Sequence, residues 1–547
     1  MIRTPFLTAL LAAVAACPLG AQVHDHRPQN APAPGTAVPL YDNLGSYHYP
    51  VTTAVPLAQR YFDQGIRLTW AFNHAEAIRA FAEGERLDST CAMCAWGSAF
   101  AAGPNINAPM DSASGVRAYE AVRRALARAA RVTPSERALI TALAERYGPD
   151  PLATRASRDS AYAAAMAQAA GRYPDDVEAQ VLHADALMNL RPWAYWQPDG
   201  APAPGTTVLL ERLERARALN ADHPGACHLY IHAVEARDPS RAVACAERLA
   251  TLMPGAGHLV HMPGHIYIRV GRYADAIDAN KHAVHADESY LEGPMVSRQG
   301  LYPQGYYPHN YHFMSFAASM AGASQTAIDA ARRTAERLGP DVIRQIPWLE
   351  AVTPIVPWTL VTFGHWDDVL REPMPPADLQ FATGMAYYAR GVALAALGRR
   401  DDAQTALDSV RGIAERFPEN DNRTALRIAA HALAGELALR GSLPAAAVRE
   451  FQTAVALEDG LTYNEPPTWY YPMRHSLGKA LLAAGQPADA ERVYREDLER
   501  FPENGWSLFG LVRALKAQGR TAEARRVAQR RAAAWSRADV DLSASRF

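Results

Sequence analysis

The sequence predicts an all-α protein in which antiparallel helix pairs stack into a solenoid, and three observations support this fold class. A glycine recurs five residues before an alanine, at Gly271/Ala276, Gly322/Ala327, Gly398/Ala403, Gly485/Ala490 and Gly519/Ala524. Each of these pairs separates two stretches of helical periodicity. The distances from Ala242 to Ala276 and from Ala490 to Ala524 are both 34 residues. A fixed period of this kind is typical of stacked helical repeats.

Small residues also recur inside the predicted first helix of several repeats, at Gly264, Gly391, Gly435 and Gly478. This pattern resembles the tetratricopeptide repeat (TPR) family, in which small residues let two antiparallel helices pack closely. The resemblance covers most of Pro56 to Trp535. It implies a TPR-type α-solenoid, a right-handed superhelix of roughly ten helix pairs with irregular insertions rich in aromatic residues and proline.

Four further motifs resemble a subgroup of exported bacterial TPR proteins. They are FNHAEA at residues 72–77, CAMC at 91–94, GPNIN at 103–107 and HMPGH at 261–265. This subgroup has no settled activity, so the resemblance supports the fold and leaves the function open.

The N-terminus has the order of a secretory signal peptide, with Arg3, an apolar run over residues 5–16 and small residues up to Ala21. Cys17 also ends a sequence that resembles a lipobox, so a lipid anchor at this cysteine is the alternative. No other long apolar run occurs, and we expect no transmembrane span. The sequence therefore predicts an exported protein, periplasmic or extracellular, either freely soluble or a lipoprotein.

The chain divides into five predicted segments. These are a signal peptide (1–21), a flexible or clamped N-terminal arm (22–55), N-terminal TPR-like repeats (56–200), histidine-rich central repeats (201–340) and C-terminal repeats (341–547). Lys and Arg number 55 against 57 Asp and Glu, for a net charge of -2. Without a basic field, the chain is not expected to bind nucleic acid.

Histidines concentrate in the central repeats, where ten of the 18 lie between His223 and His312. Three of them are spaced by three and then four residues, which places them on one face of a helix. Two more occupy matching positions in the next repeat. The predicted metal ligands are therefore His258, His261, His265, His309 and His312. Imidazole binds Zn, Cu and Fe, and the alternative is that these rings only form hydrogen bonds in a polar groove.

Other residues are candidates for the same concave groove. Three connections dense in aromatic residues and proline, at 191–198, 301–313 and 463–475, are predicted either to fold over it or to pack at the ends of irregular repeats. The predicted ligand-binding residues of the groove are His228, His232, Trp469, Tyr470 and His475. The candidates for carboxylate ligand or acid and base are Glu235, Tyr307 and Tyr311.

The cysteines give no established cofactor motif. Cys91 and Cys94 are followed by Ala95, not by the histidine that haem attachment requires, so a local disulfide or a redox-active thiol pair remains. Cys227 and Cys245 lie on the two predicted helices of one repeat. If they pair, Cys227 is unavailable as a metal ligand.

Two classes of function follow from these patterns. The first is a binding or assembly module whose groove holds a peptide, a protein or a small molecule, with the histidine cluster binding a transition metal or a polar ligand. The second is a metal-dependent enzyme, an oxidoreductase or a hydrolase, built on that cluster. The sequence contains no G-x-S-x-G, H-E-x-x-H or P-loop motif, so an enzyme has to use the histidines.

Overall fold

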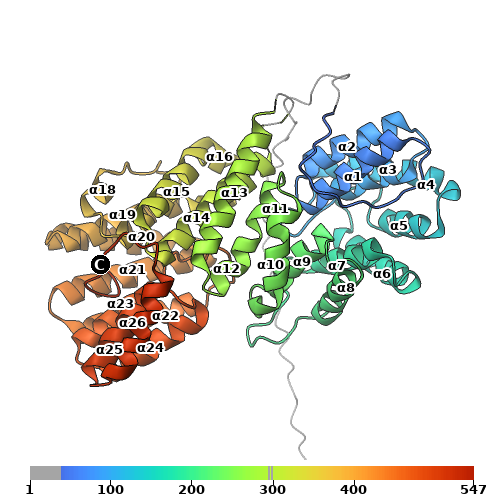
Figure 1. Cartoon of the computed structure of the whole chain (residues 1–547). Coiled ribbons are helices and arrows are strands. Elements are labelled where there is room, and N and C mark those ends of the chain that lie inside the picture. Colours follow the sequence, from blue (N-terminus) through green and yellow to red (C-terminus); the bar gives the residue numbers. More distant parts are fainter. Residues whose placement is uncertain (1–37, 294–295, 297, 299) are drawn as a thin grey trace, which may run out of the picture. The chain divides into compact units, whose positions relative to one another are not determined.

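A computed structural model of the protein describes residues 38–293, 296, 298 and 300–547. Within this part of the chain, helices follow one another from end to end (Figure 1). Within this part of the chain the only β-type pairing consists of two isolated bridges, and there is no strand. The prediction of an all-α solenoid is therefore confirmed. The predicted signal peptide, its lipid-anchor alternative at Cys17 and residues 22–37 of the arm lie outside the described residues.

The N-terminal part contains α1 (Pro56–Trp70), α2 (His74–Leu87), α3 (Ala92–Ala101), α4 (Ser112–Arg128), α5 (Pro134–Glu145), α6 (Arg155–Arg172), α7 (Val177–Leu190) and α8 (Thr206–Leu219). The central part contains α9 (Pro224–Val234), α10 (Val243–Leu252), α11 (Gly257–His261), α12 (Pro263–Arg269), α13 (Tyr273–Leu291), α14 (Tyr307–Ala321) and α15 (Ser324–Arg337). The C-terminal part contains α16 (Pro340–Gln345), α17 (Ile355–Thr362), α18 (Trp366–Arg371), α19 (Gln380–Ala396), α20 (Arg400–Arg416), α21 (Asp421–Arg440), α22 (Pro444–Asp459), α23 (Met473–Ala483), α24 (Pro487–Arg500), α25 (Gly505–Ala517) and α26 (Thr521–Ala534). Helices adjacent in sequence pack on each other, for example α1 on α2, α19 on α20 and α21 on α22.

The turns between paired helices are built as the glycine spacing predicts. All five predicted turn glycines have φ between 72° and 80°: Gly271, Gly322, Gly398, Gly485 and Gly519. Glycine adopts this left-handed conformation without a steric penalty, so each turn ends one helix and lets the next run back along it. Close packing inside a pair needs a small residue as well. A Cβ atom on Gly478 would lie 2.3 Å from the ring of Tyr494.

The described part of the N-terminal arm, residues 38–55, forms an extended strap. The hydroxyl of Tyr47 donates a 2.7 Å hydrogen bond to Glu178 on α7. The backbone N–H of Thr52 donates to Glu136 on α5 at 2.6 Å. The strap therefore connects several N-terminal helices that are far apart in sequence.

The C-terminal tail returns to the central helices. The carboxylate of Asp539 accepts a 2.6 Å hydrogen bond from the backbone N–H of Ser324, at the start of α15. The indole N–H of Trp535 donates to the carbonyl of Met320 at 2.9 Å. These contacts connect residues about 215 positions apart and fix the last helix pair against α14 and α15.

Both cysteine pairs form disulfides, Cys91–Cys94 and Cys227–Cys245. The second joins α9 to α10, so Cys227 is not available to a metal. Among the described helices, none has the length and the apolar character that crossing a bilayer requires.

Candidate metal centre

Two helical segments carry five of the histidines that gather in the centre of the protein. On α9, His228 and His232 are four residues apart and lie on the same face. The next segment is interrupted by Pro263, where α11 ends and α12 begins, but Met262 keeps a helical conformation with φ -52° and ψ -34°. The line of His258, His261 and His265 therefore continues through the junction, as the spacing predicts.

The first triad consists of His261, His265 and His309, the last from α14. Ligand atoms of the three rings all lie within 4.8 Å of one another. The Nε2 atoms of His261 and His265 are 2.9 Å apart. The ring centroids of His261 and His309 are 5.0 Å apart.

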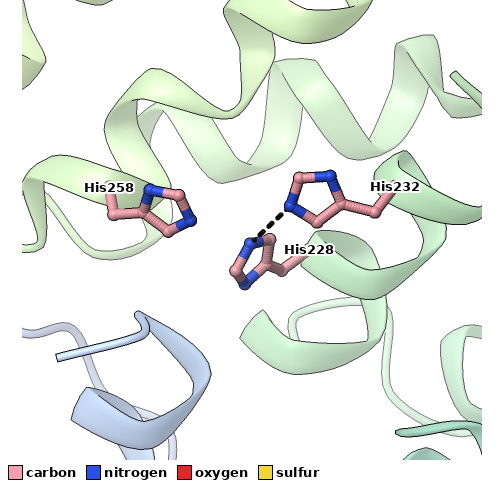
Figure 2. Close-up of side chains that lie close together, drawn as sticks. All are labelled: His228, His232 and His258. Atoms are coloured by element: carbon pink, nitrogen blue, oxygen red, sulfur yellow. Dashed lines mark hydrogen bonds between the residues drawn. The ribbon is translucent and has the colours of Figure 1, made fainter. Parts of the chain in front are cut away.

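The second triad consists of His228, His232 and His258, again with ligand atoms within 4.8 Å of one another. The Nε2 atoms of His228 and His232 are 3.2 Å apart. Figure 2 shows these two rings from α9 on one side and the ring of His258 facing them across a gap. The structure thus separates His258 from the other predicted ligands and groups it with two histidines that the sequence assigns to the ligand-binding groove.

Hydrogen bonds at Nδ1 fix the protonation of two of these rings. Nδ1 of His228 lies 2.6 Å from the carbonyl oxygen of Trp70, which can only accept a hydrogen bond. Nδ1 of His261 lies 2.8 Å from Oδ1 of Asn280, whose amide nitrogen donates to the carbonyl of Ala276. Each Nδ1 is therefore the donor, and the Nε2 of a neutral ring carries the free lone pair.

Glu235 fixes two further rings in the same way. One carboxylate oxygen lies 2.9 Å from Nδ1 of His232, and the other lies 2.6 Å from Nδ1 of His265. Burial alone would raise the pKa of Glu235, but the charges of His265 and His232 and their hydrogen bonds hold this pKa below its usual value. An ionised Glu235 accepts from both rings, one in each triad.

The facing Nε2 atoms of each pair lie at hydrogen-bonding distance, so each pair shares either a proton or a metal ion. Burial, followed by the charge of neighbouring histidines, lowers the pKa of His228 and of His261 well below the ordinary value. If both rings of a pair are neutral and protonated at Nδ1, their Nε2 lone pairs face each other at 2.9 Å in the first triad and at 3.2 Å in the second. Such an arrangement is repulsive unless a cation lies between the two nitrogens.

A cavity of about 290 Å³ adjoins both triads. Its lining includes His232 and His258 from the second triad and His265 and His309 from the first. The three aromatic and proline-rich connections all contribute to it, through Trp193, Leu301, Gly305, Tyr306, Asn464 and Glu465. The rest of the lining is mainly apolar, with Leu338, Trp348, Leu349 and Val352.

The sequence motifs near the N-terminus also lie at this site. Phe72, a non-glycine residue with φ 56°, stacks its ring on that of His258 at a centroid distance of 5.3 Å. Asn107 donates a 3.1 Å hydrogen bond to the hydroxyl of Tyr306. The ring of Tyr306 lies 4.6 Å from His258. The N-terminal repeats therefore cover the second triad.

His312, predicted as a metal ligand, belongs to neither triad. Its ring lines the cavity, with its centroid 6.1 Å from that of His309 and 6.2 Å from that of Tyr470, on which it stacks. Burial lowers its pKa to about 3. The structure places His312 in the cavity wall beside the first triad.

The two tyrosines predicted as acid or base candidates point elsewhere. The hydroxyls of Tyr307 and Tyr311 both donate to Glu288, at 2.8 and 2.9 Å, and the guanidinium of Arg337 lies over both rings. On α14, Tyr307 is about 200° around the helix from His309, so the two face opposite sides. Tyr306, which the sequence did not single out, is the tyrosine at the cavity.

The predicted groove residues of the C-terminal repeats are buried and belong to neither triad, although Tyr470 stacks on His312. Tyr470 shares a 2.6 Å hydrogen bond with Ser315 and is 1% exposed. Trp469 packs on Trp358 and lines a separate small cavity. His475 lies 3.1 Å from the carboxylate of Asp497. Aromatic packing between repeats, the alternative for this segment, accounts for these three residues.

Trp70 and Asn280 were not predicted as neighbours of the site, whereas Glu465 lies in the 463–475 connection, for which folding over the groove was one of the two expectations. Trp70 acts through its backbone, and Asn280 lies on a different helix, so neither leaves a local sequence signal. Burial, followed by repulsion from Glu235, raises the pKa of Glu465 well above its usual value. Its Oε2 lies 3.7 Å from Nδ1 of His265. The sequence signal for Glu235 is its position three residues after His232, a spacing that brings the two side chains together on one helix face.

One family model matches repeats at the C-terminal end of the chain. Residues 481–534, which include α24, α25 and α26, match the tetratricopeptide repeat family model. No curated protein matches the sequence. Among solved structures, the chain is similar to the human IFIT1 dimer with m7Gppp-AAAA. The sequence identity is 12%, the match covers 88% of this chain and 90% of that chain, and the TM-score is 0.32. The chain is also similar to yeast Tom70, with 11% identity, 87% and 91% covered, and a TM-score of 0.28.

Proposed function

We propose that the protein binds a transition-metal ion, Zn, Cu or Fe, at the first triad and uses it to act on a small molecule in the adjacent cavity. The observation that carries this proposal is the pair of Nε2 atoms of His261 and His265, which face each other at 2.9 Å, with a ligand nitrogen of His309 within 4.8 Å of both rings' ligand atoms. Two nitrogens bound to one ion at about 2.0 to 2.1 Å, at angles of roughly 90 to 110°, lie about 2.8 to 3.4 Å apart. The separation fits a shared ion.

The ligands around this ion also favour a reactive centre over a closed structural one. Three protein ligands leave a fourth position open for water or substrate, which is the pattern of catalytic zinc sites. Glu235 and Asn280 orient two of the imidazoles through Nδ1, as partners of metal-bound histidines generally do. The cavity supplies a mainly apolar volume next to this open position.

A TPR-type solenoid is suited to a binding or assembly module, which is the other class of function that the sequence predicts. The position of the histidines favours a small molecule over a peptide. His258 and His265, which line the cavity of about 290 Å³, are 2% and 3% exposed. An extended peptide needs an open surface, whereas a cavity of this volume encloses a small molecule. A metal-dependent oxidoreductase or hydrolase is therefore the proposed class.

Export is part of this proposal. It rests on the signal-peptide pattern of residues 1–21 and is supported by the two disulfides, Cys91–Cys94 and Cys227–Cys245. Disulfides persist in oxidising compartments and are rare in the cytosol. A bacterial periplasm or the extracellular space fits both observations, and fractionation of cells that express the full chain tests this expectation.

Metal analysis tests the central claim. Protein purified without a histidine tag is loaded separately with Zn, Cu and Fe, and bound metal is measured by plasma mass spectrometry. We expect the His261→Ala/His265→Ala variant to bind at least one ion fewer than the parent. The matched control is His282→Ala/His285→Ala, which removes two exposed histidines of α13 and is expected to bind as much metal as the parent. A parent protein that binds none of the three metals would contradict the proposal.

A further inference from the structure

The second triad resembles the first in each feature that suggests a metal site, although the two triads share no histidine. His228 and His232 face each other through Nε2 at 3.2 Å (Figure 2). Nδ1 of His228 donates to the carbonyl of Trp70, and Nδ1 of His232 donates to Glu235. Both Nδ1 atoms are therefore engaged by other groups, and the separation of the two Nε2 atoms fits two ligands of one ion.

His258 gives an independent sign of a missing ligand. Its side chain is 2% exposed, and neither ring nitrogen has a hydrogen-bond partner among the described residues. Buried polar atoms are almost always paired, so an imidazole with two unpaired nitrogens needs an explanation. The ring faces the other two histidines of the triad, with its centroid 5.0 Å from that of His228. An ion bound among the three rings would provide one of its nitrogens with a partner.

One ion cannot serve all six rings. Nitrogens bound at about 2.1 Å to a single ion lie at most about 4.2 Å apart. The histidine ligand atoms form two sets of three that share no ring, and a third group, His232, Glu235 and His265, joins the two sets. The triads nevertheless adjoin, because the ring centroids of His232 and His265 are 5.2 Å apart and the two rings share Glu235 as their Nδ1 acceptor.

We infer that the second triad holds a second transition-metal ion, so that the protein carries a two-ion centre in which one carboxylate orients a ligand of each site. This inference rests on the proposed function of the first triad. Histidines of both triads line the same cavity, namely His232, His258, His265 and His309. A small molecule in this cavity reaches both ions, so the substrate class is a molecule with donor atoms that contact two metals at once.

Metal stoichiometry tests the inference. The full chain without a histidine tag, stripped and then loaded separately with Zn, Cu and Fe, is expected to bind two ions at these sites with its preferred metal. His258→Ala disrupts the second triad and His309→Ala the first, and each is expected to lose one ion. The double variant is expected to lose both, whereas His282→Ala, which removes an exposed histidine of α13, keeps the full number.

The outcomes separate this inference from the proposed function. A parent that saturates at one ion, lost in His309→Ala and kept in His258→Ala, overturns the second site and leaves the first. A parent that binds no ion overturns both. The parent titration decides the ion number even if a variant fails to fold. Circular dichroism identifies such a variant, and His258→Gln then replaces His258→Ala. A His258 variant that folds and keeps every ion overturns the inference.

Discussion

Nδ1 of His265 donates a 2.6 Å hydrogen bond to Glu235, a residue 30 positions earlier in the sequence and on the preceding repeat. The other carboxylate oxygen of Glu235 accepts from His232. A single side chain thus determines which nitrogen of two imidazoles is free. A change in the charge or the hydrogen bonds of Glu235 therefore affects one histidine of each triad.

The substitution Glu235→Gln is expected to weaken metal binding. A glutamine amide accepts from one imidazole, but its NH2 group then faces the Nδ1–H of the other. That ring loses its orienting partner or changes tautomer. Loss of such a partner of a metal ligand typically reduces affinity by about 10- to 100-fold. Competition with a chromogenic chelator measures the change, and Glu247→Gln, at an exposed glutamate of α10, is the control. Unchanged affinity would contradict the role of Glu235.

The two disulfides are expected to contribute differently to stability. Cys227 and Cys245 are 18 residues apart, whereas Cys91 and Cys94 are three apart. In the chain-entropy model, a disulfide that closes a loop of the larger size stabilises the folded protein by about 3 kcal/mol. Cys227→Ala/Cys245→Ala should therefore lower the melting temperature more than Cys91→Ala/Cys94→Ala. The first variant should also lose metal more readily, because Cys227 precedes His228. Calorimetry of the two variants compares them, and the reverse order would contradict this expectation.

Asp287 is expected to make stability depend on pH. Burial raises its pKa to about 7, although Tyr302 and Asn310 donate hydrogen bonds to it. Because the folded pKa lies above the unfolded one, the folded state binds the extra proton between roughly pH 4 and 7. The free energy of unfolding should therefore fall as pH rises through this range and then level off.

The variant Asp287→Asn cannot ionise and isolates this contribution. From pH 5 to pH 8, the parent should lose on the order of 2 kcal/mol more than the variant, measured by urea denaturation. The asparagine oxygen still accepts from Tyr302. Asn310 has a free Oδ1, so its amide can reverse to match the new NH2 group. Parallel pH profiles for the two proteins would contradict the raised pKa of Asp287.

Trp193 is expected to slow the exchange of metal with solvent. Its ring lies edge-on to His232 at 5.0 Å and lines the cavity, although the residue is 38% exposed. Trp193→Ala opens this side of the cavity, so chelators should remove metal several times faster at an unchanged stoichiometry. Leu443→Ala, at the connection between α21 and α22, is the control. Equal stripping rates in the parent and Trp193→Ala would show that metal leaves by another route.

The repeat pattern allowed the turns to be predicted because they depend on local backbone chemistry. Gly271 and Gly322, which the spacing assigns to turns, both adopt the left-handed conformation. The stripe of His258, His261 and His265 was equally predictable from helix geometry. Their division between two triads was not, because it depends on His228 and His232 of α9 meeting His258 of α11, a contact between repeats.

The errors have a similar origin. Tyr307 and Tyr311 are each two residues from His309 in sequence, but the helix turns them toward Glu288. His475 and Tyr470 are buried by contacts with Asp497 and Ser315, residues of other helices. A repeat register predicts which face a residue occupies. It does not predict which neighbouring segment covers that face.

The return of the C-terminal tail changes how this solenoid is expected to unfold. An open repeat array has only nearest-neighbour contacts and can lose its terminal repeats one at a time. Here Asp539 and Trp535 bind the start of α15 and the end of α14, so the last helix pair cannot fray without exposing the centre of the chain. Cooperativity should therefore extend from the C-terminus to the repeats that carry His309, and hydrogen exchange should show both regions opening together.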